Sequence, residues 1–171
     1  MARSQAVAVA LVMTIGVLWG LNWPAVKFIL GSVPPWTFRA FAFTLGAILL
    51  AIIARRAGED LRVEMQERNP MVVASLLTVF GFNVFTAFGQ LLTETSKAAI
   101  IAFTMPMWAA LFAVIFLGEK FGLNRLASLL LGMAGLATLL AADASSVIDH
   151  PAGFLFMLGA AVSWAAGTVL L

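Results

Sequence analysis

Long apolar runs recur along this chain, and they constrain its fold more than any other feature. A run of about 20 apolar residues can cross a bilayer as a helix, whereas a secretory signal carries one short apolar core and a cleavage site. Hydrophobic residues make up 63% of the sequence and charged residues only 11%, against roughly 25% charged residues in soluble domains. The sequence therefore predicts an all-α integral membrane protein, folded as a polytopic helical bundle.

Turns and short polar segments divide the chain into six apolar runs. Pro34 and Pro35 end the first run because proline lacks the amide donor that a continuing helix needs. Pro70 is expected in the first turn of the third helix, where a missing donor costs least. The predicted spans cover about 6–30, 36–54, 70–92, 97–117, 123–142 and 152–171.

Basic residues gather on one side of the predicted bundle. Lysine and arginine near span ends favour the cytoplasm, so this distribution predicts a cytoplasmic N-terminus. With six spans, the last residue is expected on the same side. The ten basic and eight acidic residues leave too small an excess to indicate nucleic-acid binding. The predicted inner side carries Arg3, Arg55, Arg56, Arg62, Arg68, Lys120 and Arg125, and the outer side carries Lys27, Arg39 and Lys97.

A weak internal repeat relates the last apolar run to the first. At an offset of 145 residues Trp164 falls on Trp19, and the neighbouring residues are similarly small or apolar. Five spans followed by a sixth that resembles the first is the pattern of an inverted repeat, because an odd number of crossings flips the second copy. We therefore expect a five-helix repeat over 1–142, and a loop with the first helix of a second repeat over 143–171.

Short motifs at ordered spacings occur within the first five spans. Together they resemble the EamA family of the drug/metabolite transporter superfamily. The resemblance implies ten helices in two inverted repeats, in bacterial inner-membrane proteins that export amino acids or related metabolites. It also implies that this chain is partnered by four further helices or by another chain. The motif residues are Trp19, Gly20, Asn22, Pro24, Lys27, Pro34, Phe38, Arg39, Pro106, Leu117, Gly118, Glu119, Gly132 and Gly135.

Polar residues within the first span are the first candidates for substrate contact. Trp19 and Asn22 lie three residues apart on one helix face, and Pro24 leaves the carbonyl of Gly20 without its helical donor. The three residues form a polar notch in an apolar helix, which indicates either a substrate contact or gate, or an amide bonded to a neighbouring helix. Trp23 is interpreted as packing.

The third and fourth spans supply further candidates. Asn83 stands on a polar stripe with Thr86 and Gln90, which either lines a cavity or packs against another helix. Pro106 predicts a bend near the middle of the fourth span, suited to alternating access or to a static kink. Thr104, Trp108 and Trp164 complete the predicted substrate path, although tryptophans at such positions also serve packing.

Lys27 and Arg39 flank the predicted outer turn. They either anchor the helices at the interface by snorkelling, or form an outer mouth that attracts a substrate carboxylate or pairs with Glu94. Pro24 and Pro106 are the predicted gating positions within the spans.

The sequence lacks the residues of the main membrane-enzyme classes. It has no metalloprotease, phosphate-loop or serine–histidine motif and no cysteine, so we expect no catalytic residue, metal or cofactor. No acidic residue lies inside a span, so the coupling to protons that such residues provide is not indicated. The sequence favours secondary export of a small molecule by alternating access. Two alternatives stay open: a small multidrug exporter built from short chains, although the glutamate expected in its first span is absent, and a non-transporting assembly subunit.

Overall fold

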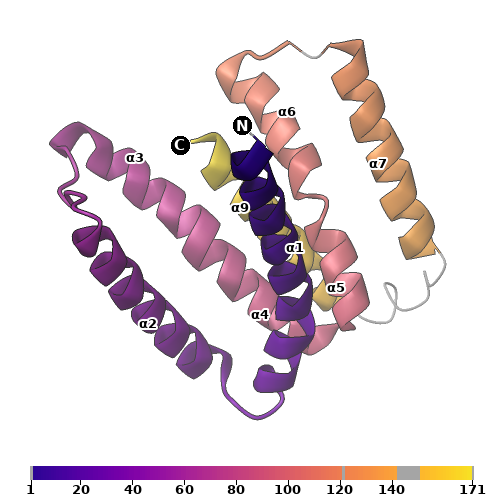
Figure 1. The fold of residues 1–171 in the computed structure, drawn as a ribbon. Helices are drawn as coiled ribbons and strands as arrows, with labels where there is room; N and C mark the ends of the chain where they lie inside the picture. Colours follow the sequence, from indigo (N-terminus) through magenta and orange to yellow (C-terminus); the bar gives the residue numbers. More distant parts are fainter. Residues whose placement is uncertain (1, 121, 142–150, 171) are drawn as a thin grey trace.

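The computed structural model describes residues 2–120, 122–141 and 151–170, and these fold into helices joined by short turns (Figure 1). No strand occurs in the described part of the chain, which confirms the predicted all-α class. The third predicted span contains three elements in succession, one of them a π-helical turn, η1. The elements are α1 (Ala2–Leu30), α2 (Pro35–Arg56), α3 (Met65–Ser75), η1 (Leu76–Gly81), α4 (Phe82–Leu92), α5 (Thr95–Ala102), α6 (Met105–Leu117), α7 (Leu123–Ala141) and α9 (Pro151–Val169).

Successive spans run up and down through the bundle, so α1 and α9 run in opposite directions (Figure 1). The start of α1 and the end of α9 lie at one end of the bundle, which we call the terminal end. The turns at 31–34 and 93–94 lie at the other end, which we call the turn end. This arrangement separates the predicted inner and outer groups of basic residues.

Five helical spans among the described residues are long and apolar enough to cross a membrane, which confirms a multi-pass membrane protein. In α7 the apolar part is shorter, Leu126–Leu139. The predicted loop at 143–151 and the predicted repeat boundary at 142–143 fall almost wholly outside the described residues. The five helices cover Gln5–Leu30, Pro35–Arg56, Met65–Leu92, Thr95–Leu117 and Pro151–Val169.

The predicted start of the third span at Pro70 is wrong, because α3 begins at Met65 and Pro70 lies inside it. Glu67 occupies the first turn, where a negative charge suits the positive end of the helix dipole. The helix therefore begins before the apolar run. At its sixth position, Pro70 leaves only the carbonyl of Gln66 without its helical donor.

Helix α9 is the centre of the packed part of the fold. It lies against η1, α4, α5 and α6, and Met157 joins a buried cluster with Ala98, Ile101 and Ala102. Glycines permit this close approach: a side chain at Gly89 would collide with Met157 Sδ, and one at Gly167 would press on the backbone carbonyl of Ala74 at 2.9 Å. Small residues at helix contacts are the usual means of packing in membranes, where water provides no driving force.

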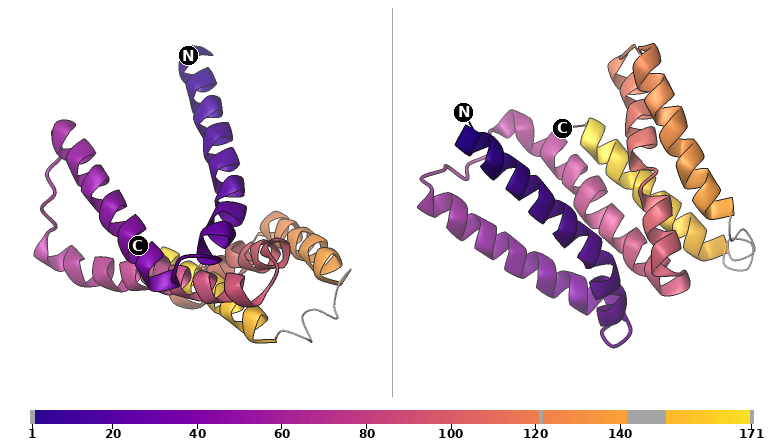
Figure 2. Two further views of the ribbon diagram at one scale, coloured as in Figure 1. Left: turned by 90° about the horizontal axis from the view of Figure 1, so that it is seen from below. Right: turned by 45° about the vertical axis from the view of Figure 1, so that its right-hand side comes forward.

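Helices α1 and α2 stand away from the packed layer over most of their length (Figure 2, left). They meet the layer at the turn end, where Val26 and Leu30 of α1 are buried with Ala87 of α4, and Phe38 of α2 packs beside them. No residue of α2 is buried. The bundle is therefore closed at the turn end and splayed at the terminal end.

Candidate functional site

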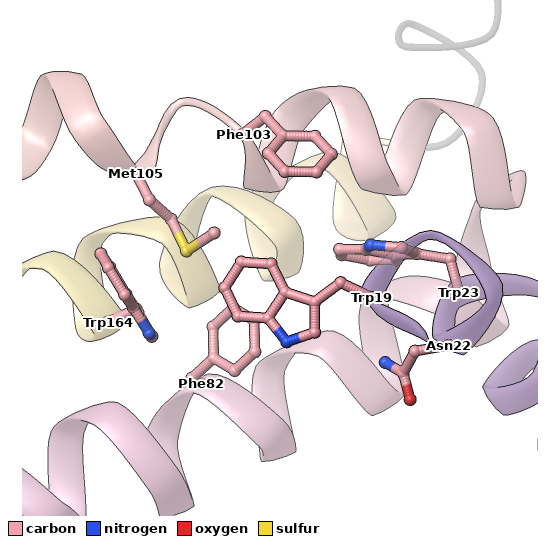
Figure 3. Close-up of a pocket in the computed structure, with 7 residues that line it drawn as sticks. All are labelled: Trp19, Asn22, Trp23, Phe82, Phe103, Met105 and Trp164. Carbon is pink, nitrogen blue, oxygen red and sulfur yellow. The ribbon is translucent and has the colours of Figure 1, made fainter. Parts of the chain in front are cut away.

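A cavity of about 80 Å³ lies where α1, the start of α4, the junction of α5 and α6, and α9 approach one another (Figure 3). Trp19 projects into the middle of the group, between Met105 and Trp23, and stays 59% exposed, so the cavity opens beside α1. Its lining is aromatic and apolar apart from one amide. The lining residues are Trp19, Asn22, Trp23, Phe82, Phe103, Met105 and Trp164.

One face of α1 provides three of these side chains, because positions three and four residues apart lie together on a helix. Trp23 anchors this face: its ring centroid lies 6.4 Å from that of Phe103, and it packs against the buried cluster of α5 and α9. Asn22 forms no side-chain hydrogen bond among the described residues, so its amide does not bond a neighbouring helix there. The amide is thus available to a ligand.

A break in the fourth span brings Phe103 and Met105 to the cavity. α5 ends at Ala102 and α6 starts at Met105, with Pro106 in its first turn, so the predicted bend is confirmed as an interruption of the helix. The hydroxyl of Thr104 donates to the carbonyl of Ile101 at 2.7 Å, which satisfies one acceptor released at the break. Unwound backbone of this kind is tolerated at membrane depth where protein surrounds it.

Three of the six predicted path residues, Trp19, Asn22 and Trp164, line this one cavity. The other three lie outside its lining. Asn83 donates from Nδ2 to the carbonyl of Val79 at 2.7 Å, and the hydroxyl of Thr104 donates to the carbonyl of Ile101.

Trp108, the third residue outside the lining, packs its ring 6.3 Å from that of Phe112, measured between centroids. Its buried Nε1 has no acceptor among the described residues. The predicted gating residue Pro106 lines a second, larger groove of about 560 Å³ between α6, α7 and α9, and Trp164 borders that groove as well as the cavity.

Sequence reasoning missed four lining residues: Trp23, Phe82, Phe103 and Met105. Each is a sequence neighbour of a residue that was singled out, or lies beside the proline that breaks the fourth span. Since a helix break turns adjacent residues in different directions, the side chains flanking Thr104, rather than Thr104 itself, reach the cavity.

Three basic residues lie at the turn end: Lys27, Arg39 and Lys97. Lys27 and Lys97 have clear partners. The ammonium of Lys27 donates to the carbonyls of Gln90 and of Thr93, the latter at 3.0 Å, and so satisfies free acceptors at the end of α4. Lys97 and Glu94 form an ion pair of 3.1 Å. Arg39 differs: one terminal nitrogen reaches Thr86 Oγ1 at 3.4 Å, and its Nε is buried with no acceptor among the described residues.

Within the described residues no group of three histidine, aspartate or glutamate side chains could hold a metal ion. The cavity instead offers indole and phenyl faces and a single amide, which is the usual character of a small-molecule binding site. Helices long enough to cross a membrane thus surround a cavity suited to a small molecule.

Residues 6–141 match the EamA-like transporter family, and the chain belongs to this family. It is 34% identical to an uncharacterized transporter, YvbV, of Bacillus subtilis over 90% of the chain and 50% of that relative. It is 28% identical to the aromatic amino acid exporter YddG of Ancylobacter novellus over 81% of the chain and 49% of that exporter.

A third relative, a probable amino-acid metabolite efflux pump of Salmonella typhimurium, is 26% identical over 93% of the chain and 51% of the pump. The chain thus spans about half the length of the curated relatives that it matches. No solved structure matches it significantly.

Proposed function

We propose that the chain forms the first half of a secondary exporter of amino acids or related small metabolites, with substrate passing through the cavity at Trp19. The observation that carries this proposal is the pairing of Trp19 with Trp164. These two residues occupy equivalent positions of the weak internal repeat, and they line one cavity from helices that run in opposite directions. A binding site between inverted repeats has this arrangement.

On this proposal, residues 1–142 are one repeat and 143–171 begin a second. The exposed faces of α1 and α2 support it: among residues 5–30 and 35–56, only Val26 and Leu30 are buried. Four further helices, or a second chain, would cover the faces that the packed layer leaves free. The relatives named above are about twice as long, which gives room for those helices.

Alternating access fits the unequal ends of the bundle. The turn end is sealed by buried apolar residues and by the bonds from Lys27, whereas α1 and α2 diverge toward the terminal end. With the N-terminus in the cytoplasm of a bacterium, as the basic residues favour, this is an inward-open arrangement in the inner membrane. Pro24 within α1 and Pro106 at the break are the proposed gating positions, and Lys27 and Arg39 flank the outer mouth.

The cavity's chemistry favours substrates with an apolar or aromatic side chain. Trp19 and Trp164 provide flat faces that also attract an amino group by cation–π interaction, and Asn22 can donate or accept a hydrogen bond. Two relatives are named as exporters of an aromatic amino acid and of amino-acid metabolites, which points to the same class.

Export from cells that express the complete protein tests the proposal. Cells are loaded with a panel of amino acids through dipeptides, and the rate at which each appears outside is compared with that of cells carrying the empty vector. We expect faster export of one or more apolar or aromatic amino acids, and loss of most of that increase in Asn22→Ala and Trp164→Ala variants. Leu155→Ala, at an exposed site on α9, is the matched control. The proposal fails if no amino acid responds, or if both cavity variants export like the parent.

A further inference from the structure

Arg39 is an unpaired guanidinium in the part of the chain that the structure describes. It is half-buried in the first turns of α2, and no acidic residue described pairs with it. Its one side-chain hydrogen bond, to Thr86, is long at 3.4 Å, and its guanidinium also lies 5.1 Å from the ring centroid of Phe38. A charge in such a place usually has a partner, because an uncompensated buried charge is costly.

The unsatisfied atoms of Arg39 lie on one edge of the guanidinium. Nε is buried and has no acceptor, and the terminal nitrogen beside it holds only the long bond to Thr86. These two N–H groups on one edge match the two oxygens of a carboxylate, which is the geometry of bidentate arginine–carboxylate recognition.

Arg39 lies just outside the cavity, on the side of the turn end. Phe82 lines the cavity, and Thr86, which holds Arg39, is one helical turn further along the same face of α4. Gln90 follows one turn later, and its buried Oε1 also has no partner among the described residues. The polar face of α4 thus leads from the cavity to the outer turn past the guanidinium.

Neither neighbour of Arg39 can take over its role. The ammonium of Lys27 is occupied by two backbone carbonyls at the end of α4. Gln90 is uncharged, so its amide cannot balance the negative charge of a carboxylate.

We propose that Arg39, held by Thr86, is a carboxylate-binding subsite between the cavity and the outer turn, and that it receives the carboxylate of the transported molecule. The inference rests on the proposed function only for the identity of the ligand. This subsite narrows the substrate class to molecules with a free carboxylate. Arg39 then binds the ligand, whereas the role of Lys27 is structural.

Binding to the purified chain in detergent tests the subsite without any transport step. The probes are phenylacetate and phenylacetamide, which differ only in the carboxylate, and binding is followed by tryptophan fluorescence or by the shift in thermal midpoint. We expect phenylacetate to bind at least about tenfold more tightly than phenylacetamide. Arg39→Gln should abolish this ratio, and Arg39→Lys should keep part of it, because a lysine retains the charge but not the two-pronged geometry.

Gln90→Leu and Lys27→Gln are the matched controls, and both should retain the ratio while helical circular dichroism confirms that each variant is folded. Equal binding of the two probes by the parent protein would overturn the inference, as would an unchanged ratio in Arg39→Gln or a ratio lost in Lys27→Gln. Because no export is measured, the outcome is independent of the proposed function: a failed export panel beside an intact ratio would overturn the exporter and leave the subsite standing.

Discussion

Ser163 of α9 donates a hydrogen bond of 2.8 Å to the backbone carbonyl of Leu77, inside the π-helical turn η1. The same hydroxyl fills the space beside Gly81, where an added Cβ would collide with Ser163 Oγ and lie 3.2 Å from the carbonyl of Leu76. The third span and α9 therefore interlock at a point where a side chain at position 81 would require Ser163 to shift. π-Helical turns are uncommon, and here the partner helix adds a side-chain hydrogen bond to the carbonyl of Leu77, which also accepts the backbone N–H of Phe82.

Gly81→Ala is expected to lower the free energy of unfolding by about 1–3 kcal/mol, because the added methyl group overpacks the contact between η1 and α9. Gly46→Ala is the matched control: Gly46 lies in α2, and nothing is within 4 Å of a Cβ built there. Thermal or denaturant unfolding in detergent, followed by helical circular dichroism, measures both. Equal effects of the two substitutions would contradict the interlock.

Ser163→Ala should cost about 0.5–1.5 kcal/mol by itself, since it removes one hydrogen bond. In the double variant with Gly81→Ala, however, the collision with the hydroxyl is gone, although the close carbonyl of Leu76 stays. We therefore expect a combined loss smaller than the sum of the two single losses. A double-mutant cycle measures this coupling, and strictly additive effects would show that the two residues do not share the space.

Lys27 contributes to stability through the end of α4. Lys27→Met keeps an unbranched side chain, shorter by one atom, but leaves the carbonyls of Gln90 and Thr93 without their donor, so we expect a loss of about 1.5–3 kcal/mol in the free energy of unfolding. Arg62→Met, on the exposed loop between α2 and α3, is the control and should change stability by less than about 0.5 kcal/mol. If both variants unfold alike, the ammonium of Lys27 is only an interface anchor.

The spans could be predicted from the sequence because hydropathy and proline placement act locally. The ends of the first two helices fall within a few residues of the predicted ones, and Pro106 marks the break in the fourth span. Trp19 and Asn22 were also recognisable, since a large indole and an amide are unusual in an apolar helix.

The rest of the site depends on contacts between distant parts of the chain. Phe82 and Met105 carry no signal of their own, because apolar side chains look the same whether they line a cavity, pack or face lipid. The π-helical turn has no sequence signature either, and Ser163, which donates to the carbonyl of Leu77 in that turn, lies far along the chain. Arg39 could be singled out by its charge. Only the structure shows that Lys27 and Lys97, the other basic residues at the turn end, already have partners.

Water should reach the cavity at Asn22 but not the interface at Thr86. The chain contains no cysteine, so single cysteine variants need no altered background. A membrane-impermeant thiol reagent is expected to modify Asn22→Cys at least about tenfold faster than Thr86→Cys, because Asn22 is exposed beside an open cavity and Thr86 is only 2% exposed. Rates are measured by mass spectrometry on the purified protein.

An exported amino acid should slow the modification of Asn22→Cys and leave that of a cysteine at exposed Leu61 unchanged. Two slow and equal rates at Asn22 and Thr86 would contradict a water-filled path. They would favour the assembly subunit, in which polar residues only join helices.

Pro106→Ala should separate transport from stability. Alanine restores the amide that can donate to the carbonyl of Ala102, so α5 and α6 can join into a straighter helix. The free energy of unfolding is then expected to change by less than about 1 kcal/mol or to rise, because alanine also has the better helix propensity.

Phe103 and Met105, however, reach the cavity only because the helix is interrupted between them. We therefore expect export to fall several-fold, with a changed rate of thiol modification at Asn22→Cys. Pro151→Ala is the matched control, since Pro151 is the first residue of α9 and its missing donor is not needed there. Parent-like export by Pro106→Ala would mean that the break is a static kink without a part in transport.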